Sequence, residues 1–229
     1  MAKGQSQQSD AKGVKQPLSR VRVLQAAIAL ADEMGLKALS MRKLAQRLGV
    51  EAMSLYNHIK NKDDLLDGMV EQVVAEIQFP AESGPAAKKD WKQAMRQRAQ
   101  SAHKVLLRHP WATLVMISRA NVGPVMLRYV DATLGCLVEA GFSLATADHI
   151  WNAIDSYLYG FTLQQLNFPF DPEDYAAAAG GYLEQLPEQE YPYLHRLTRQ
   201  VAEKQYTGLH QFETGLDVLL DGLERLDKK

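Results

Sequence analysis

A run of hydrogen-bond donors recurs at helical spacing between Ser40 and Lys62. Basic, hydroxyl and amide side chains can donate to phosphate oxygens or to acceptor atoms on base edges, which is the chemistry of DNA recognition. The candidate donors are Arg42, Lys43, Ser54, Tyr56, Asn57 and Lys62, with Ala52 and Met53 beside them able to contact a thymine methyl group. These residue types therefore predict noncovalent recognition of a nucleic acid.

Two short helices joined by a tight turn are expected to position these donors. Ser40 is a good N-cap for the first helix, because its hydroxyl can accept from an early helical N–H. Gly49 can end that helix in the left-handed conformation. A second short helix is expected over about residues 51–58, and the inward apolar positions are Leu44, Ala45, Leu48, Val50 and Leu55. This arrangement is a helix-turn-helix.

The same stretch resembles the DNA-binding domain of TetR-family transcriptional regulators, most closely the tetracycline-repressor branch. The matching segments are Met41–Glu51, Leu55–His58, Lys60–Lys62 and Leu65–Leu66, and the similarity is clear over about residues 18–75. The resemblance implies that Arg42 can reach a guanine edge and that Tyr56 and Lys62 bind phosphates. Since the tetracycline repressor carries a Gln-Pro pair and a Trp where this chain has Ala52-Met53 and Asn57, we expect a different operator sequence.

The composition is that of an ordinary globular chain of 229 residues, with 46% hydrophobic and 23% charged residues. No apolar run approaches the length of a membrane span, and residues 1–17 are expected to form a disordered polar tail rather than a secretory signal. The single cysteine, Cys136, allows no intrachain disulfide, so a cytoplasmic location is expected. No pattern indicates a catalytic residue, a metal site or a cofactor, so an enzyme is not expected.

The net charge of −1 divides unevenly along the chain. Residues 1–64 hold 11 Lys and Arg against 6 Asp and Glu, whereas residues 65–229 hold 15 against 21. A basic N-terminal part on an acidic body suits a protein that presents one end to a polyanion.

Helical periodicity continues through the chain without a strand pattern, so the fold class expected is all-α. We predict a helix-turn-helix head over residues 18–64 and a helical effector-binding and dimerisation domain over residues 65–229. A connector helix is expected over residues 62–79. Residues 168–187 carry three prolines and a Gly pair, and are expected to form a mobile loop.

Two strongly apolar helices, expected over residues 145–166 and 207–226, exceed what one small core needs. In TetR relatives the equivalent helices form the dimer interface, so the resemblance implies a homodimer. The candidate interface residues are Ile150, Ile154, Leu158, Leu209, Phe212, Leu216 and Leu220. The alternative is that both apolar faces are buried within one chain.

The effector site is expected among Met and aromatic side chains of the second domain, although plain core packing is the favoured interpretation of each one taken singly. The candidates are Met95, Arg98, His103, Trp111, Met116, Met126, Trp151, Tyr157 and Phe161. Met116 falls near the position of the histidine that holds the metal–drug complex in the tetracycline repressor. An apolar or mixed aromatic molecule is therefore expected as the effector rather than tetracycline–magnesium.

These features together predict a homodimeric repressor of transcription that leaves a palindromic operator when a small molecule binds. Two alternatives stay open: a transcriptional activator of the same fold, and a helical small-molecule-binding protein or enzyme whose helix pair is structural.

Overall fold

The computed structural model describes residues 17–78, 90–120 and 122–226, whose regular elements are all helices, as expected. Of the expected polar tail, residues 1–16 lie outside this part of the chain. The helices are α1 (Arg20–Met34), α2 (Met41–Leu48), α3 (Ala52–Leu55), α4 (Lys62–Ala75), α6 (Trp91–Arg108), α7 (Pro110–Ser118), α8 (Pro124–Glu139), α9 (Leu144–Leu166), α10 (Tyr175–Leu183), α11 (Pro192–Ala202) and α12 (Phe212–Leu223), with a 3₁₀ turn, η1 (Leu36–Ala38), after α1.

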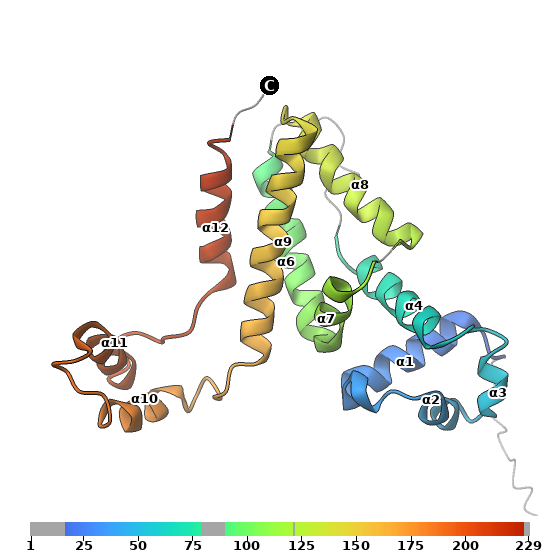
Figure 1. Ribbon diagram of the computed structural model, residues 1–229, viewed down its shortest axis with the longest axis horizontal. Coiled ribbons are helices and arrows are strands. Elements are labelled where there is room, and N and C mark those ends of the chain that lie inside the picture. Colours follow the sequence, from blue (N-terminus) through green and yellow to red (C-terminus); the bar gives the residue numbers. More distant parts are fainter. Residues whose placement is uncertain (1–16, 79–89, 121, 227–229) are drawn as a thin grey trace, which may run out of the picture.

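Figure 1 shows how these helices divide in space. Helices α1 to α3 form a head at one end, and α4 leads from it to the body, which consists of α6 to α9 with α12 alongside. Helices α10 and α11 form an arm that stands apart from the body. Within residues 17–78, 90–120 and 122–226, no helix has both the length and the apolar character that crossing a membrane requires.

The helix ends of the head are set by local side-chain and backbone features. The hydroxyls of Ser19 and Ser40 accept the backbone N–H groups of Arg22 and Lys43, each at 3.3 Å, and so cap α1 and α2. Gly49 ends α2 with φ 66° and ψ 37°, a left-handed conformation that costs glycine little. The predicted cap and turn of the helix-turn-helix are therefore confirmed.

Helix α4 connects the head to the body and passes very close to α1. A Cβ atom at Gly68 would lie 2.7 Å from Leu24 Cδ2, so the absence of a side chain permits the close crossing. The helix ends at Ala75, short of the expected residue 79, and residue 79 itself lies outside the described part. Its last turn tightens, since the N–H groups of Glu76 and Ile77 bond carbonyls three residues back, at 3.1 and 3.0 Å.

The assignment of the late apolar side chains to a dimer interface was wrong for six of the seven. Ile150, Ile154 and Leu158 on α9 are at most 1% exposed within the single chain, and Phe212, Leu216 and Leu220 on α12 are at most 3% exposed. They belong to the apolar core, in which α12 packs on α9 and α6. Leu209, the seventh, precedes α12 and is partly buried. The intrachain alternative holds because α12 folds back along its own α9.

The segment 168–187, expected as a loop, contains a helix. Tyr175–Leu183 forms α10, because the run Ala176–Ala179 favours helix strongly enough to outweigh the glycines that follow it. Helix α10 packs against α11, and Ala179, Leu186 and Val201 are buried in this part of the chain. Proline residues flank α10 rather than interrupt it.

Candidate DNA-binding surface and effector site

The structure places the predicted DNA-contact residues on the surface of the head. Arg42, Lys43, Asn57 and Lys62 are exposed, as are Met53 (74%) and Tyr56 (46%), while Ala52 and Ser54 are partly exposed. Helix α3 is regular only to Leu55, shorter than expected, because the chain then turns to bury Ile59. The short helix α3 therefore presents only a few side chains to the solvent.

The basic residues of the head fall into two groups that differ in what they already bind. Arg47 donates two hydrogen bonds of 2.6 Å to the carboxylate of Glu33, which lowers the pKa of Glu33. Arg42, Lys43 and Lys62 form no ion pair with any residue that the structure describes. Their charges are therefore available to an external anion such as a phosphate.

Asp64 holds the end of the reading unit in place. Arg20 of α1 donates to both oxygens of this carboxylate, at 2.7 and 3.0 Å, and the backbone N–H of Lys60 donates at 2.8 Å. The hydrogen bond from Arg20 lowers the pKa of Asp64, so the carboxylate stays ionised at neutral pH. These bonds tie the turn after α3 to both α1 and α4.

Asp32 of α1 binds the body at the corner between α6 and α7. His109 Nδ1 lies 2.9 Å from Asp32 Oδ1, and Trp111 Nε1 donates to the same oxygen at 2.7 Å. The two partners are nearly sealed from solvent, since His109 is 8% and Trp111 6% exposed. Trp111, predicted as an effector contact, is therefore a link between the head and the body.

Two further sets of contacts join α4 to the start of α8 and to the end of α7. The carboxylate of Glu71 accepts the backbone N–H groups of Val125 and Met126, at 2.8 and 3.0 Å, and so caps α8. Arg119 donates to Asp63 and Asp67 of α4, each at 2.9 Å. These contacts hold α4, the helix that carries the head, against the end of α7 and the start of α8.

We expect Asp32→Ala to lower the free energy of unfolding by about 1–3 kcal/mol, because it leaves buried donors on His109 and Trp111 unpaired. Urea unfolding measures the change. Glu33→Ala is the matched control, since the neighbouring Glu33 pairs only at the surface with Arg47, and it should change stability little. Equal effects of the two substitutions would show that the Asp32 contacts are not a specific link.

The nine predicted effector residues make several different sets of contacts within the chain. Arg98 and Trp151 both bind Asp155, inside the body. His103, Tyr157 and Phe161 form an aromatic cluster with Phe212, whose ring stacks on His103 at 4.2 Å. Met95 and Met116 are buried in the core, and Met126 packs partly buried against it. Burial lowers the pKa of His103, so its imidazole is neutral at pH 7.

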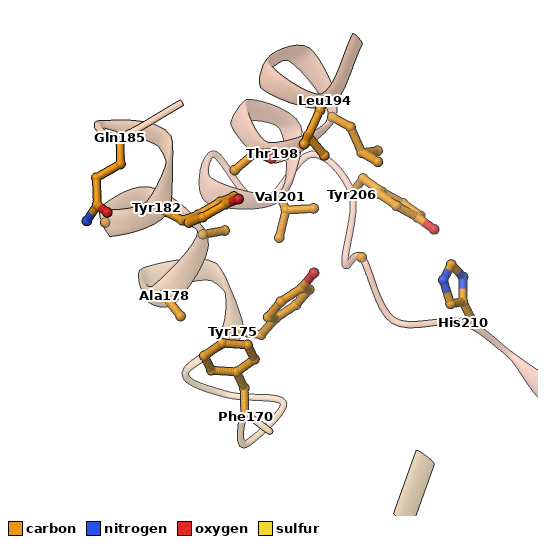
Figure 2. A pocket seen from close by; sticks show the side chains of 14 residues that line it. Phe170, Tyr175, Ala178, Tyr182, Gln185, Leu194, Thr198, Val201, Tyr206 and His210 are labelled. Carbon is orange, nitrogen blue, oxygen red and sulfur yellow. The ribbon is translucent and has the colours of Figure 1, made fainter. Parts of the chain in front are cut away.

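Two hollows lie outside the body core and share Tyr206 and His210. One has a volume of about 680 Å³ and is lined partly by the predicted Tyr157 and Phe161. The other, of about 740 Å³, lies between α10 and α11, and Figure 2 shows Phe170 and Tyr175 among the side chains that line it. The residues of the arm hollow were missed, although the aromatic side chains between Phe168 and Tyr206 were a visible signal.

Comparisons with known proteins agree with this architecture. Residues 84–226 match the family described as tetracyclin repressor-like, C-terminal domain, and residues 23–69 match bacterial regulatory proteins of the tetR family. The class D tetracycline repressor protein of Escherichia coli is 32% identical over 90% of this chain and 89% of its own length. A transcriptional regulator of Saccharopolyspora erythraea is 36% identical over 62% of this chain, and the match spans 59% of that protein.

A solved structure of the same fold is the TetR family protein ActR of Streptomyces coelicolor in complex with actinorhodin. It superposes with a TM-score of 0.74 at 29% identity, covering 91% of this chain and 98% of that one. The helix-turn-helix head, the helical body and both family matches lead to one conclusion: this chain belongs to the TetR family of DNA-binding transcriptional regulators, which are not enzymes.

Proposed function

We propose that this chain is a homodimeric repressor that binds a pseudo-palindromic operator and is released by a small-molecule effector. The observation that carries the proposal is the exposed group Arg42, Lys43 and Lys62 on the helix-turn-helix, which pairs with no described carboxylate. Unpaired cations beside a short reading helix can bind phosphates and base edges. The protein would act in the cytoplasm, where its operator lies.

Dimerisation is supported by the outward faces of α9 and α12. The exposed side of α9 carries short or amide residues at four-residue spacing: Asn152, Ser156, Gly160 and Gln164. On α12, Val218 is 72% exposed. Short side chains allow close approach of a second copy. A two-fold dimer would present two heads to half-sites about 34–36 Å apart.

Effector control is supported by the contacts between the body and the head. Relatives include proteins named tetracycline repressor and the actinorhodin-bound ActR. For this chain we propose a mixed aromatic effector that binds within the body. The bound effector would favour a body conformation in which the contacts of Asp32 and Glu71 shift, so that the two heads no longer fit adjacent major grooves. The coupling free energy between effector binding and operator binding would be about 1–3 kcal/mol.

Footprinting of the purified protein on the DNA upstream of its own gene tests this function. The proposal requires a protected palindrome, whereas binding that is only non-specific and salt-sensitive contradicts it. A reporter assay with and without the protein then gives the sign of regulation. Higher output without the protein identifies a repressor, and lower output identifies the activator alternative.

A further inference from the structure

Met53 is the most exposed methionine in the part of the chain that the structure describes. It is 74% exposed, whereas Met69 and Met95 of the core are 0% and Met116 is 7% exposed. The other exposed methionine of these residues is Met34, at the end of α1, which is 52% exposed. A reagent dissolved in water therefore reaches the thioether of Met53 readily and those of the core poorly.

The position of Met53 places this thioether on the surface expected to meet DNA. Met53 lies on α3, the helix with which the proposed repressor reads its operator. That helix buries Leu55, which is 0% exposed, and leaves Met53 in solvent. In the major groove the C5-methyl group of thymine is an apolar feature of the base edge, and a flexible thioether can adapt its shape to such a group.

Hydrogen peroxide can convert this thioether to a sulfoxide without a cofactor. The sulfur attacks one peroxide oxygen, so that an S–O bond forms as the O–O bond breaks, and the other oxygen leaves as water. The sulfur loses two electrons and the peroxide gains them. The product, methionine sulfoxide, is polar, and sulfoxide reductases return it to methionine.

The single cysteine is a poorer target for the same oxidant. Cys136 is buried on α8. Burial raises the pKa of its thiol, so little of the reactive thiolate is present at neutral pH. An effect of peroxide on the protein is therefore expected first at the exposed thioethers.

We propose that Met53 is a reversible oxidation site through which a peroxide releases the protein from its operator. A sulfoxide placed against a thymine methyl group loses the water bound to its oxygen and gains no hydrogen bond, which disfavours the complex. This inference rests on the proposed function, because it requires α3 to read the operator. It adds a second signal, which acts on the head itself and needs no ligand in the body.

Peroxide treatment of the full chain, followed by peptide mass spectrometry, tests the site. We expect Met53 and Met34 to be oxidised before the buried methionines, and bound operator DNA to protect Met53 but not Met34. Oxidation should lower operator affinity roughly 10–100-fold, the effect of one polar group buried without a partner. Treatment with reductases for both sulfoxide epimers should restore the affinity.

Two leucine variants form the matched pair, since leucine is apolar and has no sulfur. Met53→Leu should bind the operator nearly as tightly as the parent and no longer respond to peroxide, whereas Met34→Leu should respond as the parent does. Met53→Gln puts a polar group at the same position and should weaken operator binding without any oxidant. Because Met53 is exposed, these changes remove no buried contact at that position.

Unchanged operator affinity in protein whose Met53 is fully oxidised overturns the inference. So does resistance of Met53 to peroxide, a lack of protection by operator DNA, or a loss of affinity that persists in Met53→Leu. Untreated protein is footprinted first. The absence of a protected palindrome at that stage contradicts the repressor function and this inference with it, whereas a footprint that survives oxidation of Met53 contradicts this inference alone.

Discussion

Replacing Arg42 and Lys62 together with alanine should weaken operator binding roughly 100-fold and leave the fold intact. An arginine that contacts a guanine edge contributes about 1–3 kcal/mol of discrimination, and a lysine on a phosphate adds a salt-dependent contribution. Both side chains are exposed and join no described ion pair, so the substitutions remove no structural contact. Affinity measured across a salt series separates the two contributions, since the slope should fall by about 0.9 for each lost phosphate contact.

Arg47→Ala is the matched control for this prediction. Arg47 lies on the same helix-turn-helix, but its guanidinium is held by Glu33 through two bonds of 2.6 Å. We therefore expect a much smaller change in affinity. A loss as large as that of the double variant would mean that Arg47 leaves Glu33 to bind DNA, and that ion pairing in the unbound chain does not identify the DNA-contact residues.

Phe212→Ala should lower the free energy of unfolding by about 3–5 kcal/mol, because it removes a core ring and leaves a cavity. The ring is 3% exposed, stacks on His103 at 4.2 Å and meets Phe161 edge-on at 5.4 Å. Urea unfolding, carried out at several protein concentrations, measures the loss and separates it from dissociation of a dimer.

Val218→Glu on the same helix should disrupt the proposed dimer and leave the stability of each chain nearly unchanged. Its side chain is 72% exposed, so a charge there should change the stability of one chain little, but it would repel the equivalent residue across a two-fold interface. Sedimentation analysis should therefore show monomers for Val218→Glu and not for Phe212→Ala. If Phe212→Ala instead dissociated the dimer at unchanged chain stability, Phe212 would contribute to the interface.

The head could be predicted in detail because its signals are local. The cap at Ser40 and the left-handed turn at Gly49 depend on residues within one helical turn, and the structure confirms both. Exposure of the predicted DNA contacts follows from the same periodicity. The arm could not be predicted as well, because prolines flanking Tyr175–Leu183 suggested a loop where an alanine run forms a helix.

Helical spacing and residue chemistry were enough to predict the all-α class, the helix-turn-helix and the exposure of the candidate DNA contacts. The tertiary structure was needed to find what each apolar face packs against. Periodicity predicts an apolar helix face that includes Leu216, but it does not predict which helix covers that face. The tertiary structure also decided the polar contacts. Asp32 and Trp111 are 79 residues apart, and Arg98 and Asp155 are 57 apart. Such pairs follow from helix packing over distances in the chain at which local spacing carries no information.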